Sequence, residues 1–360
     1  MISFARGAPA PECIPVAELA DCARAAVERD GIAALSYGPV GGYAPLREWL
    51  GERHGVPPER VLITNGGLQG LLFVAETLLA RGGRRVLVEG PTYDRTLTIL
   101  AKLGAEVEGV PMDEEGLDLE ALATALDARP PPAFIYTIPT FQNPSGRTLG
   151  PERRRRLVEL AREHGVPLLE DDPYGLVRFE GEPPPTLHEL VDGESVVYAS
   201  SFSKTIAPGV RVGYFVLPAP LLAELEGPIA STYISPGTLA QGTVYEFLRR
   251  GRLEPNLERV RGLLRARRDS MLEALERELG GSGATWSRPK GGYFLWLDVP
   301  SADTRELLAA AADAGVVFVP GPDFGGPPSS ARLAYSFVSP AEIASGVTRL
   351  AGLVSAPAAV

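Results

Sequence analysis

Short apolar runs alternate with amphipathic stretches along the first two thirds of the chain. Four of these runs predict buried strands, at Val86–Val88, Phe134–Tyr136, Val166–Leu169 and Val196–Tyr198. Between them, apolar residues at helical spacing predict helices at about 94–103, 118–128 and 151–164. This alternation predicts an α/β fold, with a mostly parallel sheet and helices on both of its faces. Sheets of this kind bind ligands at the carboxyl ends of their strands.

The C-terminal part has a different pattern. A long helix is predicted at about 256–279, after Pro255, and is followed by a helix near 303–313 and three strand-like runs, Tyr293–Leu297, Val316–Val319 and Ala331–Tyr335. A helix at about 16–29 is expected to join this part. We therefore expect a large domain at residues 37–255, a smaller discontinuous α+β domain at residues 1–36 and 256–360, and a cleft between them.

Composition narrows the class of protein. The chain has 360 residues, of which 45% are apolar and 22% charged, as in ordinary soluble globular proteins. Its net charge of −10 gives no support for nucleic-acid binding. No apolar run is long enough to span a bilayer, and the N-terminus lacks a signal-peptide core, so no membrane contact is expected. Cys13 and Cys22 show no metal or redox spacing, which favours a reduced cytoplasmic protein, and the three histidines show no metal-ligand spacing.

Candidate chemistry begins with a lysine that follows a predicted strand. Lys204 ends the segment Ser200–Lys204, and Arg211 lies seven residues later. A lysine in this setting can form a Schiff base with an aldehyde cofactor, while its hydroxyl and arginine neighbours hold a phosphate. The alternative is an exposed loop lysine. The segment alone leaves the two interpretations about even.

Three further segments also follow predicted strands. The glycines of Thr64–Gly70 can turn backbone N–H groups toward an anion at a helix N-terminus, or can form a plain glycine-capped turn. Tyr93, in Gly90–Tyr93, can lie flat on an aromatic cofactor ring or pack on the surface. Asn143, in Gln142–Gly146, can donate a hydrogen bond to a phenolate oxygen or belong to an Asn-Pro turn.

The segment Glu170–Tyr174 places three acids at a strand end. Adjacent strand residues point to opposite faces, so these acids rarely converge on one metal ion. One carboxylate beneath a pyridine ring could instead hold the ring nitrogen protonated. A third interpretation is that these residues cap the following element.

Taken in order, these segments resemble the fold-type I pyridoxal-phosphate enzymes, specifically the class I/II aminotransferases. The resemblance is greatest to the branch that contains 2-aminoadipate and kynurenine aminotransferases. It covers nearly the whole chain and is carried by Ser36–Arg47, Leu62–Gln69, Pro91–Tyr93, Gln142–Gly146, Glu170–Tyr174, Ser201–Lys204 with Arg211, Pro289–Phe294 and Arg332.

The resemblance implies pyridoxal 5'-phosphate as cofactor and Lys204, Asp171 and Tyr93 as catalytic residues. Lys204 would carry the Schiff base and shuttle the proton, Asp171 would pair with the pyridine nitrogen, and Tyr93 would stack on the ring. Tyr174 and Asn143 would hydrogen-bond the ring hydroxyl oxygen.

The resemblance also implies how the ends of the ligands are held. The phosphate would be held by Gly67, Leu68, Gln69, Ser201, Ser203 and Arg211. Arg332 would pair with the substrate α-carboxylate, beside Asn143. Tyr37 would reach the phosphate of the neighbouring subunit, which implies a homodimer with shared active sites.

Two departures from the family concern substrate choice. Related enzymes often carry a longer N-terminal arm over the active site, whereas this chain starts almost at Ser3–Pro11. Relatives commonly have glycine where Arg6 stands. Arg6 could bind a second carboxylate of the substrate, narrow the pocket, or point to solvent.

The resemblance predicts an aminotransferase that moves an amino group between an L-amino acid and a 2-oxo acid through a Lys204 Schiff base. An alternative on the same fold is a lyase, cyclase or oxidase of a specialised pathway. A third class is the aminotransferase-like module of certain transcription regulators. We expect it least, because the residues before Ser36 are too few for a helix-turn-helix domain and the chain is acidic.

Overall fold

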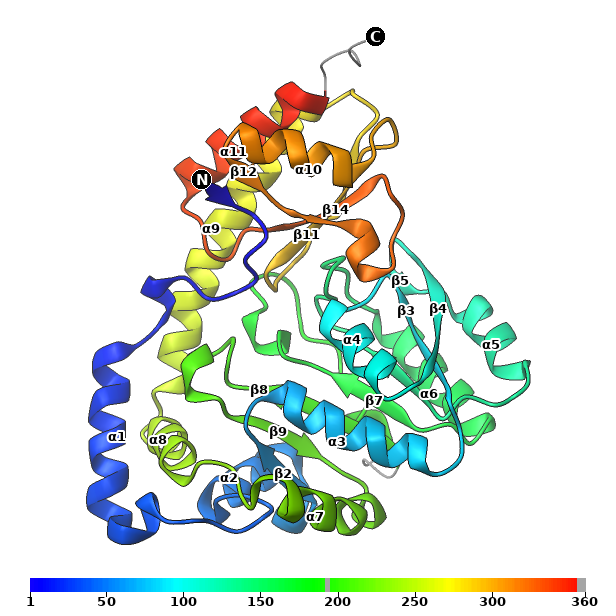
Figure 1. Ribbon diagram of the computed structural model, residues 1–360. Helices are drawn as coiled ribbons and strands as arrows, with labels where there is room; N and C mark the ends of the chain where they lie inside the picture. Colours follow the sequence, from blue (N-terminus) through cyan, green and yellow to red (C-terminus); the bar gives the residue numbers. More distant parts are fainter. Residues whose placement is uncertain (192–194, 355–360) are drawn as a thin grey trace.

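A computed structural model of the protein describes residues 1–191 and 195–354 (Figure 1). Its centre is an eight-stranded sheet in the order β2-β9-β8-β7-β6-β3-β4-β5. The strands are β2 (Val61–Thr64), β3 (Arg85–Gly90), β4 (Glu106–Asp113), β5 (Gly116–Leu117), β6 (Phe134–Thr137), β7 (Leu168–Asp171), β8 (Val196–Ser201) and β9 (Gly213–Val216). The five strands from β8 to β4 are parallel, whereas β9 is antiparallel to both of its neighbours and β5 is antiparallel to β4. The predicted mostly parallel sheet is confirmed.

Helices cover both faces of this sheet, as predicted. Strand β6 shows why, since Phe134 and Tyr136 pack toward one face and Ile135 toward the other. The first face is covered by α3 (Gly67–Ala80), α4 (Asp94–Lys102) and α7 (Ala219–Tyr233). The second is covered by α5 (Leu119–Asp127) and α6 (Pro151–Glu163). Strands apolar on both sides therefore lie between two layers of helices.

The predicted boundaries hold to within a few residues, and two of the differences occur at prolines. Strand β7 begins at Leu168 rather than Val166, after Pro167. The long helix α9 (Leu253–Leu279) begins before Pro255 rather than after it. A proline in the first turn of a helix is tolerated because its missing N–H would have no intrahelical partner there.

The C-terminal part forms a second, antiparallel sheet in the order β10-β11-β14-β13. Its elements are β10 (Thr285–Trp286), β11 (Phe294–Asp298), β13 (Val319–Pro320) and β14 (Ser330–Ala334), with helices α10 (Thr304–Asp313) and α11 (Pro340–Val354). The prediction of one strand at Val316–Val319 is wrong. Val316 and Val317 form β12, which pairs with β1 (Ile2–Ser3), whereas Val319 pairs in β13 with Arg332. The chain changes sheets at Phe318, whose side chain is buried.

The N-terminal residues contact both parts of the molecule. Strand β1 pairs with β12 of the C-terminal part, but α1 (Val16–Asp30) packs along α8 (Thr238–Arg249) near the large sheet (Figure 1). Helix α2 (Ala44–His54) lies next to α8. Helix α9 extends along both parts (Figure 1). In residues 1–191 and 195–354, no helix has the length and apolar character needed to cross a membrane.

Candidate active site

A cavity of about 180 Å³ lies at the carboxyl ends of the central strands, beside the N-terminus of α3. It collects segments that are far apart in the sequence because parallel strands end at the same edge of the sheet. The predicted site residues that line it are Gly67, Leu68, Tyr93, Asn143, Asp171, Tyr174, Ser201, Ser203, Lys204 and Arg211.

Lys204 lies in the turn that follows β8, and its side chain points into this cavity. Its Nζ donates a hydrogen bond to the carbonyl oxygen of Gly7 at 2.6 Å. The same Nζ lies 5.8 Å from the ring centre of Tyr174 and 5.3 Å from that of Tyr293. Burial, together with the nearby positive charges of Arg332 and Arg211, lowers the pKa of Lys204 to about 8. A larger share of Lys204 is therefore neutral near pH 7–8 than of an ordinary lysine, and only the neutral amine can act as nucleophile or base.

Asp171 ends β7 and faces the same cavity. Its Oδ2 accepts a hydrogen bond of 2.7 Å from the hydroxyl of Tyr136, on the adjacent strand β6. Burial raises the pKa of Asp171 to about 7, whereas the hydrogen bond from Tyr136 opposes this rise. A cation against Asp171 would favour its ionised form, so the carboxylate suits a protonated ring nitrogen.

The two acids beside Asp171 face away from the cavity. Glu170 accepts the backbone N–H groups of Leu187 and His188 at 2.9 and 3.0 Å. Asp172 accepts the N–H of Gly175 at 2.8 Å and the hydroxyl of Tyr198 at 3.1 Å. The three carboxylates thus do not converge, as the alternation of side chains along a strand predicts. In the described ranges 1–191 and 195–354, no group of three or more His, Cys, Asp or Glu could hold a metal ion.

One end of the cavity has the features of an anion site. Helix α3 begins here after Gly66, which has a φ of +88° and provides no side-chain cap. The φ of Gly66 favours glycine, and a Cβ at this position would also displace the guanidinium of Arg211. Arg211 itself has a φ of +50°, and its Nη2 donates to the carbonyl oxygen of Asn65 at 3.2 Å. The helix N-terminus, the arginine and two serine hydroxyls together suit a phosphate.

Two tyrosines line the middle of the cavity. Burial raises the pKa of Tyr93 to about 12 and holds the pKa of Tyr174 well above its ordinary value. Both phenols therefore stay protonated at neutral pH and can donate hydrogen bonds. This suits Tyr174 as a partner of a ring oxygen and Tyr93 as a neutral stacking surface.

Arg332, on β14 of the second sheet, is connected to the cavity through the lining residue Asn143. Its Nη1 donates to Asn143 Oδ1 at 3.0 Å, and its Nη2 donates to the carbonyl oxygen of Ala5 at 2.8 Å. The guanidinium lies 4.3 Å from the ring centre of Phe294 and 4.8 Å from that of Phe324. Its Nε is buried and has no hydrogen-bond partner within the described part of the chain. A buried guanidinium with an unused donor and no carboxylate partner suits the carboxylate of a ligand.

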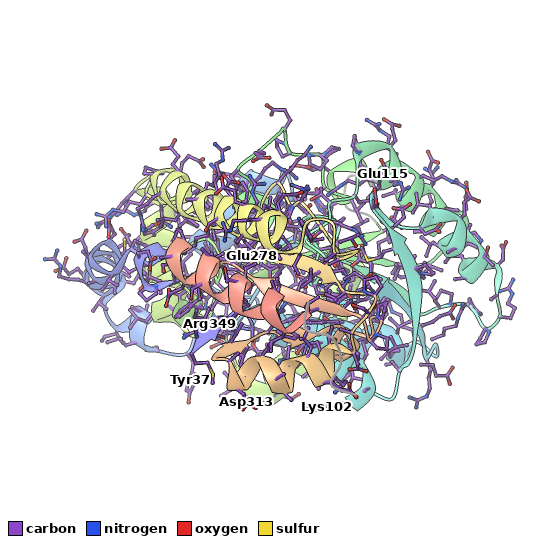
Figure 2. All side chains as sticks on the ribbon, turned by 90° about the horizontal axis from the view of Figure 1, so that it is seen from above. Tyr37, Lys102, Glu115, Glu278, Asp313 and Arg349 are labelled. Atoms are coloured by element: carbon purple, nitrogen blue, oxygen red, sulfur yellow. The ribbon has the colours of Figure 1, made fainter. Side chains whose placement is uncertain are left out.

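Besides Arg332, three predicted residues lie outside the cavity lining. Gln69 turns back, and its Oε1 accepts the backbone N–H of Asn65 at 2.8 Å. The side chain of Tyr37 is 82% exposed and projects at the margin of the molecule (Figure 2). Arg6 is exposed, and its guanidinium lies 3.9 Å above the ring centre of Phe337.

Some contacts in the site were not predicted from the sequence. Tyr136 belonged to a run that predicted only a buried strand, although a tyrosine next to a strand end can direct its hydroxyl at a neighbouring strand. The backbone carbonyl oxygens of Ala5 and Gly7 accept hydrogen bonds from Arg332 and Lys204, and the side chains of these two residues do not indicate such contacts. Both come from the N-terminal segment, whose Phe4 carbonyl also accepts the N–H of Ala334.

These groups fit pyridoxal phosphate. A lysine with a lowered pKa, a buried carboxylate and an anion site at a helix N-terminus line one cavity, and an arginine with a free donor contacts its lining residue Asn143. Each is matched in charge to one end of the cofactor or its amino-acid substrate.

Comparison with known proteins gives the same result. The family model of the class I and II aminotransferases matches residues 8–350. The 2-aminoadipate transaminase of Thermus thermophilus is 39% identical over 357 residues, covering 97% of this chain and 89% of that protein. The aromatic-amino-acid aminotransferase 1 of Thermococcus litoralis is 34% identical over 364 residues, covering 98% and 87%.

Among solved structures, the α-aminoadipate aminotransferase LysN of Thermus thermophilus, complexed with N-(5'-phosphopyridoxyl)-L-leucine, aligns with a TM-score of 0.93. It is 38% identical, and the match covers 98% of this chain and 92% of that one. The chain therefore belongs to the class I and II aminotransferases, and it is a pyridoxal-phosphate-dependent aminotransferase of fold type I.

Proposed function

We propose that the enzyme transfers the amino group of an L-amino acid to a 2-oxo acid in this cavity, with Lys204 as the residue that bonds the cofactor and moves the proton. The observation that carries the proposal is that Lys204 and Asp171 line one cavity, while Arg332 donates a hydrogen bond to Asn143, which lines the same cavity. Lys204 and Asp171 come from the large sheet and Arg332 from the small one, and each has the charge that its role requires.

Bound pyridoxal phosphate supplies an electron sink for the bond that breaks at the substrate α-carbon. Asp171 sustains this sink when its ionised carboxylate pairs with the ring nitrogen. Arg332 orients the amino acid by its α-carboxylate. Lys204, which has a lowered pKa, accepts the α-proton at Nζ and returns it to the cofactor carbon.

Asn143 connects the two sides of the site. It accepts a hydrogen bond from Arg332 through Oδ1, so its amide nitrogen remains available to the ring oxygen. One side chain thereby fixes the distance between the carboxylate receptor and the cofactor ring.

Reductive trapping tests the assignment of Lys204. The chain has only three lysines, Lys102, Lys204 and Lys290, and the other two are exposed. Borohydride treatment of the holoenzyme, followed by peptide mass spectrometry, should place the cofactor on Lys204 alone. Lys204→Ala should lose both the label and turnover, whereas Lys290→Ala should keep both. Label on Lys102 or Lys290 in the native enzyme would exclude the proposed role.

We further propose that the enzyme works as a homodimer with shared active sites. Large apolar side chains are exposed in three segments, and they are Ile32, Leu35, Tyr37, Leu68, Leu72, Ile234 and Leu239, of which Leu68 also lines the cavity. Hydrogen bonds tie its parts together, from Thr238 to the carbonyl oxygen of Ser36 and from the N–H of Gly38 to Ser235. Exposed large apolar side chains that gather on neighbouring segments are typical of a protein interface. Because Tyr37 is exposed and does not line its own cavity, it is available to contact a second copy.

Subunit mixing tests the shared site. Lys204→Ala and Tyr37→Ala homodimers should each have little activity. In a mixed dimer, one site receives its lysine from one subunit and its tyrosine from the other, so unfolding and refolding the two variants together should restore activity. If the mixture stays as inactive as its components, Tyr37 does not act across the interface.

We propose that Arg6 contributes to the choice of amino donor. Its neighbours Ala5 and Gly7 contact Arg332 and Lys204, so Arg6 lies at the entrance to the site. Its guanidinium has a ring contact with Phe337 but no carboxylate partner in the described part of the chain. A relative named for 2-aminoadipate, a dicarboxylic amino acid, makes a second substrate carboxylate the ligand to test.

We also propose a domain division and a cellular location. The division into a large unit at 37–255 and a small unit at 1–36 with 256–360 is supported by the separate eight-stranded and four-stranded sheets. A cytoplasmic location is supported by the free, buried thiols of Cys13 and Cys22.

A further inference from the structure

The segment Pro289–Phe294 is part of the family pattern, but none of its side chains has a role in the reaction described above. Its Tyr293 is 1% exposed and lies just before β11 of the small sheet. The Tyr293 hydroxyl donates a hydrogen bond of 2.9 Å to the backbone carbonyl oxygen of Lys204. Its ring also contacts Tyr174, with ring centres 5.5 Å apart.

The next carbonyl along the chain is held in the same way. The side-chain amide of Asn256, on α9, donates a hydrogen bond of 2.7 Å to the carbonyl oxygen of Thr205. Asn256 is 6% exposed. Residues 202–207 form a turn outside any helix or strand, in which the backbone N–H groups of Ile206 and Ala207 both donate to the carbonyl oxygen of Phe202. The next two carbonyl groups that are held in the turn, those of Lys204 and Thr205, accept hydrogen bonds from side chains outside the large sheet.

Both side chains are themselves fixed. The carbonyl oxygen of Tyr293 accepts the N–H of Tyr335 at 3.1 Å. Gly291 and Gly292, which precede Tyr293, lie so close to Phe141 that a Cβ on either would overlap its side chain. The Oδ1 of Asn256 accepts a hydrogen bond of 2.6 Å from Arg259. The turn is therefore attached to rigid, buried groups.

We propose that Tyr293 and Asn256 are positioning residues that hold the backbone of the Lys204 turn so that Nζ meets the reactive carbon of the cofactor. The inference rests on the proposed role of Lys204. A lysine side chain has four rotatable bonds and loses much of its rotamer entropy when it is ordered. A fixed backbone anchor limits how far Nζ can depart from bonding distance, and misplacement by about 1 Å is costly for a reacting group.

The test separates the lysine–cofactor bond from the rest of cofactor binding. Pyridoxal phosphate bonds to Lys204 when the neutral Nζ attacks the aldehyde carbon, a C=N bond forms, and one water molecule leaves. Pyridoxamine phosphate has the same ring and phosphate but an amine in place of the aldehyde, so it binds without that bond. The ratio of the two affinities for the apoenzyme therefore reports how well Lys204 is placed.

For Tyr293→Phe we expect pyridoxal phosphate to bind about three- to tenfold more weakly, the effect of one lost hydrogen bond, with the affinity for pyridoxamine phosphate unchanged. Asn256→Ala should lower the ratio in the same direction and serves as the second variant if Tyr293→Phe does not fold. Tyr335→Phe is the matched control, because its buried hydroxyl donates to the carbonyl oxygen of Gly291 and does not touch Lys204. It should leave the ratio unchanged.

Equal losses for the two cofactor forms would show that Tyr293 only stabilises the fold, and an unchanged ratio in both variants would also overturn the proposal. Failure of the proposed role of Lys204 looks different. In that case the wild-type enzyme and Lys204→Ala would have the same ratio of affinities for pyridoxal phosphate and pyridoxamine phosphate.

Discussion

The two sides of the cavity are built in different ways. The cofactor side comes from strand ends and turns of one sheet, between Gly66 and Arg211, and its key groups lie within a few residues of β7, β8 and α3. The substrate side is assembled from Arg332 on another sheet, the carbonyl groups of Ala5 and Gly7, and aromatic residues such as Phe294. The first side is a local product of parallel-sheet topology, whereas the second exists only once distant segments have docked.

This difference predicts which property each side controls. Changes on the cofactor side should alter cofactor affinity, the protonation of the ring and kcat. Changes on the substrate side should alter KM and donor preference while cofactor binding stays constant. Asn143 and Tyr293 connect the two sides, through Arg332 and Lys204 respectively, and are the places where this separation can fail.

The largest effect is expected for Asp171→Asn. A neutral amide cannot pair with a charged ring nitrogen, so kcat should fall by about 10²–10³-fold, as when one preorganised electrostatic partner is removed. Stopped-flow measurement of the first half-reaction, in which the amino acid becomes its 2-oxo acid, should locate the loss in that step. A kcat within a few-fold of wild type would remove Asp171 from the cofactor side.

The same variant should stabilise the apoenzyme. The pKa of Asp171 in the folded apoenzyme is about 7, above its unfolded value of about 3.9, so the ionised carboxylate destabilises the fold above pH 7. This penalty is relieved as the pH falls from 8 through 7 toward 4. At pH 8 the free energy of unfolding of apo Asp171→Asn should exceed that of the wild type by a few kcal/mol, at most about 4, and the difference should shrink as the pH falls and vanish below about pH 4. Urea unfolding across this pH range measures it, and a constant difference would contradict the assigned pKa.

Arg332→Lys should give the next largest effect and confine it to the substrate side. Lysine keeps the charge but loses the planar pair of donors, so kcat/KM should fall by about 10- to 100-fold, the effect of one or two charge-assisted hydrogen bonds. The affinity for pyridoxal phosphate should not change. Arg288 is an exposed arginine between β10 and β11 that pairs with Glu276. The control variant Arg288→Lys should match wild type in both measurements. A parallel loss of cofactor affinity in Arg332→Lys would break the separation of the two sides.

The smallest effect is expected for Arg6→Gly. An exposed ion pair contributes up to about 1 kcal/mol, so kcat/KM for 2-aminoadipate should fall by about two- to fivefold. The value for phenylalanine, which has no second carboxylate, should stay constant. If the ratio of kcat/KM for 2-aminoadipate to kcat/KM for phenylalanine does not change, Arg6 does not select the donor and has only its contact with Phe337.

The predicted elements differ in how well the sequence specified them. Strands that are apolar on both sides, such as Phe134–Tyr136, were found because a buried parallel strand leaves a continuous apolar run. The run Val316–Val319 was equally apolar, yet its two halves pair in different sheets. An apolar run indicates burial, but it does not state which strand will be its partner.

By itself, the sequence determined the α/β order, the motifs at the strand ends and the opposed directions of Glu170, Asp171 and Asp172. These follow from local periodicity and from the common edge at which parallel strands end. Only the tertiary structure decided that Tyr136 would support Asp171, that Tyr293 and Asn256 would hold the Lys204 turn, and that Gly7 would contact Nζ. Each of these contacts joins residues from different elements through a single hydroxyl, amide or carbonyl group. No local pattern encodes such a pairing, because it depends on how the segments pack rather than on their own propensities.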